Sequence, residues 1–376
     1  MADGLKSYWP NYVGGQWIEG GGGRIAVEDP ASGETIAEQA LADAGDVDQA
    51  VVAARSLAAA LTAGNACVVK TPELDPLTGA YMAEAAEAAG LPAGAVNILC
   101  GLGPEAGAAL VAHAGVDQIV FTGSVETGKS IARAAADTIV PCVLELGGKS
   151  AAIVYPDADM DGLMSSVRWG IFFNAGQVCS ALSRLIVHRD VHDEIADRVA
   201  DLAKSLSVGP GMERPDFGDN MGPMISEKQL ERAEGLCRQA ESEGAAAITG
   251  GRRLNRPGYF LEPTVFTGVS PEMTIARTEV FGPVLSVLPF EDDRQAIEIA
   301  NGTDYGLVAG VFTSDLDRAT AAMRDLKAGQ IFVNEWYAGG VETPFGGYKK
   351  SGYGREKGRE ALWNYVQTKN VALTVK

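Results

Sequence analysis

Two side chains of this sequence have the chemistry of a nucleophile and a base. Cys179 follows an apolar stretch that the small residues at 174–176 interrupt. A thiol attacks as the thiolate, and backbone N–H groups of a turn or helix N-terminus can lower its pKa and later hold an oxyanion. Glu145 lies between apolar residues where a strand runs into a glycine turn, so desolvation would raise its pKa toward that of a general base. Each residue alone has a simpler interpretation, a buried structural cysteine and a surface acid. Together they indicate a nucleophile and a group that activates water.

Alternating strand and helix patterns must position these two residues. The pattern predicts strands over 66–70, 96–99 and 119–122, a helix over 77–89, and a second alternation from 151–154 past 185–187 to 330–334. Such alternation predicts an α/β fold with two doubly wound parallel-sheet domains and ligands bound beyond the carboxyl ends of the strands. A further helix is expected after Asp46, with apolar residues at Val47, Val51, Ala54, Ala58 and Leu61. The tail 365–375 alternates like an exposed strand.

Composition excludes several classes of function. The 376 residues suggest two or three domains, and 49 acidic against 31 basic residues give a net charge of −18, which disfavours nucleic acid and anionic membranes as partners. Five irregularly spaced cysteines argue for a reduced compartment and against disulfides or a zinc site. The three histidines show no ligand spacing, so no metal is expected. The amino terminus lacks the apolar core of a signal peptide and no run reaches membrane-spanning length, so a cytoplasmic location is the default expectation.

The segment 123–130 matches the phosphate-binding pattern G-x-x-x-x-G-K-[ST] and follows a predicted strand. Taken alone, it would support a nucleoside triphosphatase, with Asp157 after the strand 151–154 as a magnesium ligand. That alternative leaves Cys179 and Glu145 without a role. The same strand, turn and helix could instead hold a dinucleotide pyrophosphate on the free N–H groups of the helix N-terminus.

Four motifs in order along the chain resemble the aldehyde dehydrogenase superfamily. They are Leu-Glu-Leu-Gly-Gly-Lys around Glu145, Asn-Ala-Gly-Gln-Val-Cys-Ser around Cys179, Glu-Val-Phe-Gly-Pro at 279–283, and Pro-Phe-Gly-Gly-Tyr-Lys at 344–349 with Ser-Gly at 351–352 and Gly-Arg-Glu at 354–356. The resemblance covers nearly the whole chain. It implies an NAD-binding domain at 1–147 that is internally shortened, a catalytic domain at 148–351, and a C-terminal segment at 352–376 that includes an oligomerisation strand.

The resemblance also implies roles for individual residues. Cys179 would attack an aldehyde carbonyl, hydride would pass to NAD, and Glu145 would deprotonate the water that hydrolyses the resulting thioester to a carboxylic acid. No metal is needed. The cofactor-binding residues implied are Lys70, Glu73, Gly123, Ser124, Leu146, Glu279 and Phe281. A carboxylate at position 73 accepts hydrogen bonds from a ribose 2′-hydroxyl and repels a 2′-phosphate, which favours NAD over NADP. A histidine-assisted thiol hydrolase is the competing use of Cys179, but no nearby histidine has an evident relation to it.

The chain departs from the family near residues 55–60, where a segment of roughly a hundred residues is absent by length comparison. In the family this segment supplies a strand of the nucleotide-binding sheet, part of the assembly surface and a Trp-Asn-Phe-Pro loop whose Asn is the second oxyanion donor. Loss of one such donor costs about 100- to 1000-fold in rate. Three outcomes stay open: an active aldehyde dehydrogenase with a small-molecule aldehyde substrate and a weakened homo-oligomer, a silent remnant that binds dinucleotide or associates with other subunits, and a chain that does not fold stably.

Overall fold

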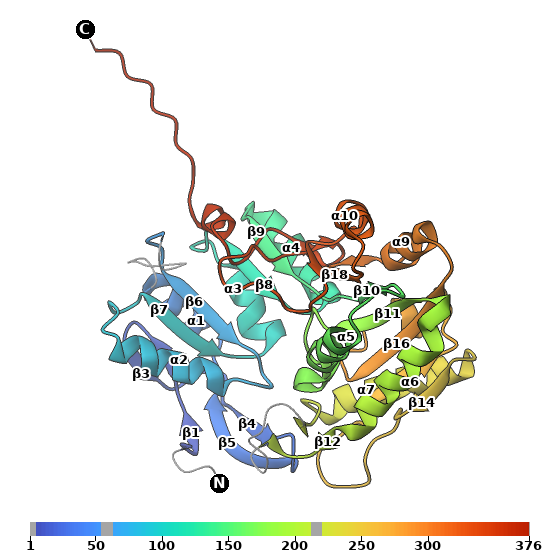
Figure 1. Cartoon of the computed structure of the whole chain (residues 1–376). Coiled ribbons are helices and arrows are strands. Elements are labelled where there is room, and N and C mark those ends of the chain that lie inside the picture. The colour runs from blue at the N-terminus through green and yellow to red at the C-terminus, as the bar shows by residue number, and fades with distance from the viewer. Residues whose placement is uncertain (1–4, 54–62, 212–219, 376) are drawn as a thin grey trace.

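A computed structural model of the chain describes residues 5–53, 63–211 and 220–375. Its largest unit is a seven-stranded sheet in the second half of the chain (Figure 1). Six of its strands run parallel and one edge strand, β14, is antiparallel. In spatial order the strands are β14 (Ala246–Thr249), β15 (Thr264–Thr267), β16 (Val284–Phe290), β11 (Leu182–His188), β10 (Ser150–Val154), β18 (Val308–Phe312) and β19 (Gln330–Val333).

This sheet is buried on both faces, as parallel sheets require. Every residue of β10 and β18 is buried, and both strands are apolar apart from Ser150, so the sequence folds here as continuous hydrophobic runs. The helices of this unit are α5 (Met160–Val167), α6 (His192–Ser205), α7 (Glu227–Ser242), α8 (Thr274–Arg277), α9 (Asp293–Asn301) and α10 (Leu316–Asp325). The predicted second doubly wound sheet is confirmed.

The described strands in the first half of the chain, together with β21 from its C-terminal part, form three smaller sheets instead of one. The strand orders are β1-β5-β4, β3-β2-β7-β6 and β21-β9-β8. Among the described strands of these three sheets, only β1–β5, β6–β7 and β8–β9 are parallel pairs. The strands are β1 (Tyr8–Trp9), β2 (Asn11–Val13), β3 (Gln16–Ile18), β4 (Arg24–Asp29), β5 (Glu34–Ala40), β6 (Cys67–Thr71), β7 (Val96–Cys100), β8 (Ile119–Thr122), β9 (Cys142–Glu145) and β21 (Gly352–Tyr353). The predicted single parallel sheet is therefore interrupted between β6 and β8.

Helices of the first half cover these small sheets. They are α1 (Ala44–Ala53), α2 (Leu77–Ala88), α3 (Ala108–Ala112) and α4 (Val125–Thr138). The expected apolar positions Ala54, Ala58 and Leu61, and the proposed junction near 55–60, lie outside the described residues. No helix in the described ranges is long and apolar enough to cross a bilayer.

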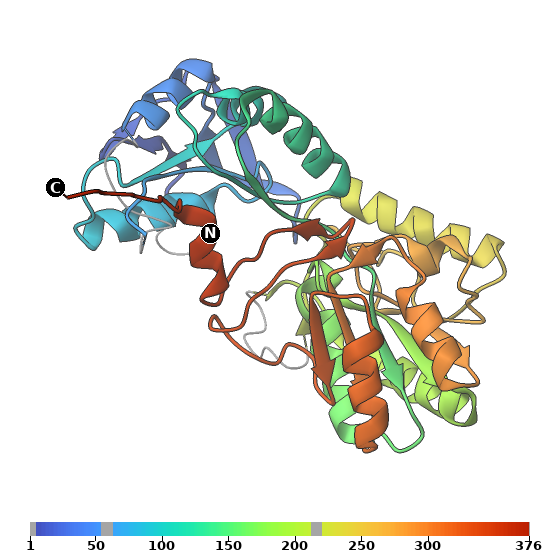
Figure 2. The same cartoon turned by 90° about the horizontal axis from the view of Figure 1, so that it is seen from above.

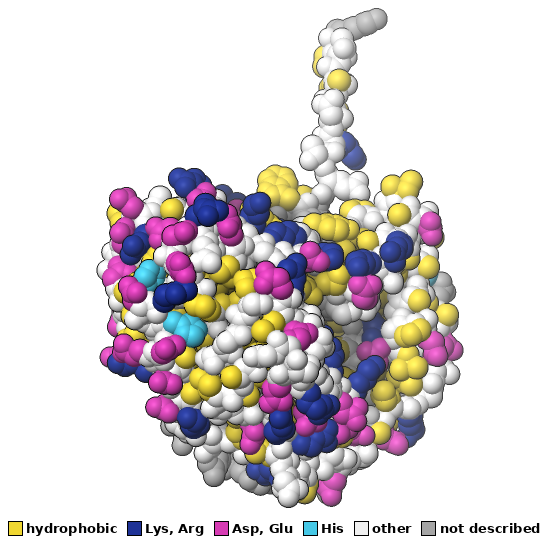
Figure 3. Space-filling model, turned by 90° about the vertical axis from the view of Figure 1, so that its right-hand side faces the viewer, with side chains coloured by type: hydrophobic (Ala, Val, Ile, Leu, Met, Phe, Trp, Pro, Cys, Tyr) yellow, Lys and Arg dark blue, Asp and Glu magenta, His cyan; other side chains and the backbone are white. Residues whose placement is uncertain are grey.

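The C-terminal segment returns to the first half of the molecule. β21 pairs antiparallel with β9, and a short 3₁₀ helix follows at Glu360–Tyr365. The expected strand over 365–375 is wrong for the single chain, because residues 366–375 form no strand and extend away from the body (Figures 1 and 2). An extended segment forms a strand only when its backbone hydrogen-bonds to a neighbouring strand, and this tail, which projects from the surface (Figure 3), has none within the described residues.

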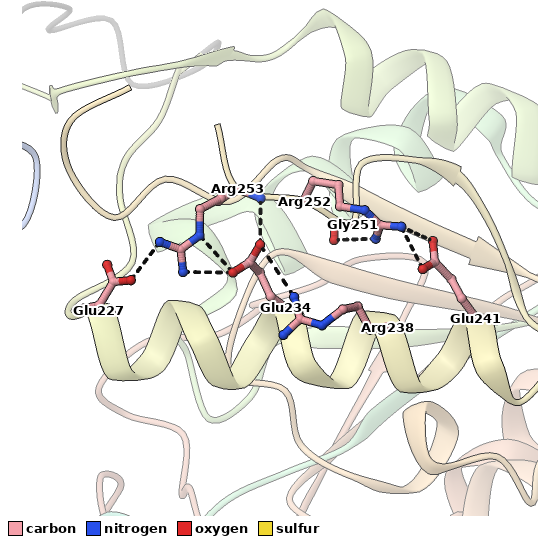
Figure 4. Close-up of polar contacts among 7 residues, drawn as sticks. All are labelled: Glu227, Glu234, Arg238, Glu241, Gly251, Arg252 and Arg253. Atoms are coloured by element: carbon pink, nitrogen blue, oxygen red, sulfur yellow. Dashed lines mark hydrogen bonds and ion pairs between the residues drawn. The ribbon is translucent and has the colours of Figure 1, made fainter. Parts of the chain in front are cut away.

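An ion-pair network fixes α7 to the loop that follows β14 (Figure 4). The Arg253 guanidinium contacts Glu227 at 2.7 Å and Glu234 at 2.9 Å, and Arg252 donates two hydrogen bonds to Glu241. Burial alone would raise the pKa of Glu234, but the hydrogen bonds and charge of Arg253 lower it below its usual value. The network matters because Gln229 and Arg232, which lie on the same helix between Glu227 and Glu234, hold part of the site described next.

Candidate active site

Cys179 lies in a turn that leads into β11. The preceding residues Asn174, Ala175 and Gly176 all have positive φ, of 50°, 51° and 68°. The turn is held by Gln177, whose side-chain amide donates to the carbonyl of Asn174 and accepts from the N–H of Ile225 at 2.7 Å. Backbone strain of this kind persists only where the surroundings fix it. The turn was predicted from the sequence, and the contact with Ile225 shows that a second loop holds it in place.

The environment of the Cys179 sulfur corrects one expectation. Backbone N–H groups of Ser180 and Cys179 do lower the pKa of the thiol, as the sequence suggested. Burial is the larger effect and raises it, and the negative charges of Glu279 and Glu145 raise it further. In this state the thiol is therefore more protonated than a free cysteine at the same pH.

Glu145 ends β9 and is buried, with 2% of its surface exposed. Neither carboxylate oxygen has a hydrogen-bond partner among the described residues. Burial, and next the negative charge of Glu356, raise the pKa of Glu145 to about 8, against the opposing charge of Arg355. The expectation of a desolvated carboxyl with a raised pKa is confirmed. A carboxyl of this kind is a stronger base than an ordinary one, and it accepts a proton through its ionised fraction, which grows as the pH approaches about 8.

The motif at 344–356 positions Glu145, a role that the sequence did not reveal. Gly352 pairs with Glu145 across the β21–β9 ladder, and Ser351 accepts the Leu146 N–H and donates its hydroxyl to the Gly147 carbonyl at 2.7 Å. A side chain at Gly346 would lie 2.8 Å from Oε1 of Glu145. Glycine at this position therefore leaves room for the carboxylate.

Glu279 joins the Glu145 loop to the Cys179 loop. Its Oε1 accepts the Gly148 N–H at 3.0 Å, and its charge raises the pKa of Cys179. Burial raises the pKa of Glu279 itself, against the Gly148 hydrogen bond and the charges of Arg232 and Lys149. A Cβ atom at Gly148 would lie 2.5 Å from the Cys179 carbonyl oxygen, so only glycine allows the two loops to approach this closely. Residues of both loops line one pocket: Gly148, Gly176, Val178, Glu279 and Phe281.

Two residues of α7 hold the loop that carries Glu279 and Phe281. Gln229 donates to the carbonyls of Val280 and Phe281, and Arg232 donates to the carbonyls of Glu279 and Val280, at 2.7 to 2.9 Å. Phe281 has a φ of 55°, a conformation that needs such support. Sequence reasoning missed both helix residues, because contacts to main-chain carbonyls leave no motif.

Four of the predicted cofactor residues lie on the interrupted sheets. Lys70 contacts Glu73 at 3.0 Å, and Glu73 also accepts the Gly103 N–H. Burial would raise the pKa of Glu73, but these bonds lower it, so the carboxylate is ionised and can accept hydroxyl groups. Gly123 and Ser124 are exposed between β8 and α4, where Ser124 caps the helix by accepting the N–H of Thr127. The N–H groups of the first helical turn are accessible to an anion.

Leu146, the remaining predicted cofactor residue, is buried with its side chain beside Gly128 of α4. A side chain at Gly128 would lie 2.6 Å from Leu146, so this contact sets the distance between α4 and the end of β9. Its assignment to cofactor binding stays a prediction.

The nucleoside triphosphatase alternative does not fit this geometry. Helix α4 begins at Val125, so Gly128 and Lys129 lie inside the helix and cannot form a loop around phosphates. Lys129 pairs with Glu126 on the helix surface. Asp157 follows β10 in the other sheet and accepts hydrogen bonds from Thr313 and Ser314.

The chain was compared with known proteins. It is 44% identical over 320 residues to mouse "Aldehyde dehydrogenase, cytosolic 1" and 43% identical over 313 residues to the aldehyde dehydrogenase of Emericella nidulans. These matches cover 85% and 83% of this chain, but only 63% and 62% of the relatives. The chain thus spans less than two thirds of the length of the curated relatives it matches.

Solved structures show the same likeness. An NAD⁺ complex of an aldehyde dehydrogenase from Bacillus cereus superposes with a TM-score of 0.93 at 32% identity, covering 98% of this chain and 97% of that chain. A crystal structure from Burkholderia cenocepacia, also described as an aldehyde dehydrogenase, gives 0.90 at 34% identity. The family model for the aldehyde dehydrogenase family matches residues 51–371. On this evidence, the chain belongs to the aldehyde dehydrogenase family.

Proposed function

We propose that this chain oxidises a small aldehyde to a carboxylic acid with NAD, with Cys179 as nucleophile and Glu145 as base. The observation that carries the proposal is the buried Glu145 carboxyl, which has no hydrogen-bond partner among the described residues and whose charge reaches Cys179. Such an acid is costly to bury and is retained where it does chemistry.

The protein's own residues account for each step. The Cys179 thiolate adds to the aldehyde carbon, and the Cys179 N–H can hold the oxygen that becomes negative. When bound, NAD supplies the acceptor for the hydride that leaves this carbon. Water then attacks the thioester carbon and gives a proton to Glu145, the carbon–sulfur bond breaks, and the carboxylic acid leaves as the Cys179 thiolate is restored. Because one oxyanion donor is absent from the sequence, we expect a rate about 100- to 1000-fold below that of a complete site.

The residues present fit the cofactor. Gly123 and Ser124 would place a pyrophosphate at the N-terminus of α4, and the ionised Glu73 would accept ribose hydroxyls. Glu279 would hold the nicotinamide ribose, and Phe281 would pack near the ring. The domain boundaries 1–147, 148–351 and 352–376 and a cytoplasmic location belong to the same proposal.

The direct test detects the covalent acyl group on Cys179. The purified chain is incubated with a simple aliphatic aldehyde and NAD, and its mass and NADH production are measured. We expect an acyl adduct at position 179 and NADH formation in the wild type and in Cys142→Ala, and neither in Cys179→Ala. Equal rates with and without Cys179 would reject the nucleophile assignment.

A silent dinucleotide binder is the second candidate, because the interrupted sheet separates Glu73 from the phosphate turn. If no variant turns over, a rise in melting temperature with NAD identifies a binder without activity.

A further inference from the structure

Tyr337, in the loop that follows β19, holds a backbone conformation that side chains rarely adopt. Its φ is 66°, in the left-handed region, and Asn334 at the start of the same loop has a φ of 58°. A residue other than glycine in this region costs free energy and persists where its surroundings fix it, most often at functional sites. No step of the proposed reaction has yet used this side chain, so its surroundings are informative.

Contacts with two other segments hold Tyr337 beside the Cys179 turn. The Tyr337 hydroxyl donates to the carbonyl of Gly170 at 3.4 Å. The preceding residue, Trp336, is buried, its ring centroid lies 6.4 Å from that of Tyr337, and its indole N–H donates to the carbonyl of Ser180 at 3.2 Å. Cys179 and Tyr337 are both partly buried against the same hydrophobic core. The loop after β19 is thus tied to the residue that directly follows the nucleophile.

The Tyr337 hydroxyl stays protonated at neutral pH. Burial is the largest effect on its pKa, which rises to about 12 although hydrogen bonds with the side chains of Ser180 and Trp336 oppose the rise. The negative charge of Cys179 raises the pKa of Tyr337 further, so the hydroxyl lies within electrostatic reach of the sulfur. A phenol in this state can donate a hydrogen bond to an oxygen that becomes negative nearby and still keep its proton.

The hydrogen bond to Gly170 leaves this donor available for another acceptor. O–H···O bonds in proteins usually measure about 2.5–3.0 Å, so the bond of 3.4 Å to the carbonyl is long and weak. A charged oxygen accepts hydrogen bonds that are shorter and roughly twice as strong as those to a neutral carbonyl. An oxyanion beside Cys179 would therefore compete well with Gly170 for the Tyr337 hydroxyl.

We propose that the Tyr337 hydroxyl is a second donor, beside the Cys179 N–H, to the oxyanion that forms when the Cys179 thiolate attacks a carbonyl carbon. This inference rests on the proposed function, in which Cys179 is acylated. The carbonyl oxygen gains an electron pair as the sulfur–carbon bond forms, and the phenol donates a hydrogen bond to it without transferring its proton. The loss of rate given above for an absent donor applies to a site with the Cys179 N–H alone, and Tyr337 offsets it.

Two reactions of the Cys179 thiolate, both without coenzyme, test the proposal. Attack on 4-nitrophenyl acetate passes through an oxyanion, whereas alkylation by iodoacetamide forms none. The release of 4-nitrophenolate and the mass of the peptide that carries position 179 give the two rates. We expect Tyr337→Phe to slow acylation about 100- to 1000-fold and to leave alkylation unchanged. Tyr155→Phe is the matched control, because this buried tyrosine follows the carboxyl end of β10, whereas Cys179 precedes the amino end of the parallel neighbour β11.

A second replacement separates the lost hydrogen bond from a disturbed fold. 3-Fluorotyrosine at position 337 keeps the hydroxyl and makes it a stronger donor, so acylation should be at least as fast as in the wild type. Slow acylation with this residue, an unchanged rate in Tyr337→Phe, or equal slowing of acylation and alkylation would each overturn the proposal.

The formation of NADH from an aldehyde is measured separately. Its absence in a wild type that the ester acylates would reject the dehydrogenase activity without touching the role of Tyr337. Equal NADH formation in the wild type and Tyr337→Phe would reject the donor and leave the proposed function standing. A wild type that the ester does not acylate at position 179 would overturn both.

Discussion

Replacement of Glu145 by Gln tests the electrostatics of the site through stability. The carboxyl is 2% exposed, its oxygens have no hydrogen-bond partner within the described ranges, and its pKa is raised to about 8. The folded state holds the Glu145 proton more tightly than the unfolded chain does. The contribution of this carboxyl to the free energy of unfolding therefore falls as pH rises from about 4.5 to about 8. Glutamine does not titrate, so the same position contributes no pH dependence in the variant.

The magnitude follows from the shift. The pKa of Glu145 is near 4.5 in the unfolded chain and about 8 in the fold. With these values, the stability of the wild type relative to Glu145→Gln falls by about 2.5 kcal/mol as the pH rises from about 5.5 to about 7.5. Any constant cost of burying an amide cancels in this difference. Urea unfolding at the two pH values measures it, with Glu231→Gln on the exposed face of α7 as the matched control.

Parallel pH dependence of stability in the wild type and Glu145→Gln would contradict the prediction, because the carboxyl would then titrate normally in the fold. The same shift has a kinetic counterpart. At pH 7 only about a tenth of Glu145 would be ionised, so thioester hydrolysis should rise with pH up to about 8. A flat profile of acyl-enzyme breakdown over this range would separate Glu145 from the hydrolytic step.

Three further substitutions test residues around the candidate active site. Gly346→Ala should lower the melting temperature and slow thioester hydrolysis, because the new Cβ would lie 2.8 Å from the Glu145 carboxylate; an unchanged rate of acyl-enzyme breakdown would contradict this. Arg232→Ala removes the hydrogen bonds to the carbonyls of Glu279 and Val280. The rise in melting temperature that NAD causes should become smaller, while the melting temperature of the free protein changes little. An unaltered NAD response would argue against a positioning role for Arg232. Burial lowers the pKa of Lys149 to about 7, so between pH 7 and pH 10 the unfolded chain binds a proton at this amine more tightly than the fold does. Lys149→Met should therefore stabilise the protein more at pH 7 than at pH 10, as measured by urea unfolding. Equal gains at both pH values would show that the amine is not desolvated.

Local pattern predicted most of the elements. The strand at 119–122 and the helix after Leu77 match β8 and α2 closely, because hydrophobic runs and glycine punctuation are read from neighbouring residues. Pairing of strands could not be predicted in the same way. Whether β6 and β8 join one sheet depends on a strand between them, and the expected strand at 365–375 depends on a partner edge.

The site was predicted in part for the same reason. Glu145 followed from a polar residue within an apolar strand end, and its raised pKa is confirmed. The thiol of Cys179 was expected to be more acidic, but burial and then two carboxylates that are distant in sequence raise its pKa. Gln229 and Arg232 act on main-chain oxygens of another loop and left no signal in the sequence.

The interruption between β6 and β8 has a thermodynamic consequence. Glu73 follows β6 and Ser124 follows β8, so within the described residues no continuous hydrogen-bonded ladder fixes the separation between the ends of a bound dinucleotide. Coenzyme bound at both ends would itself fix that separation, and any change that fixed the two sheets relative to each other would in turn favour coenzyme binding, since such coupling is reciprocal.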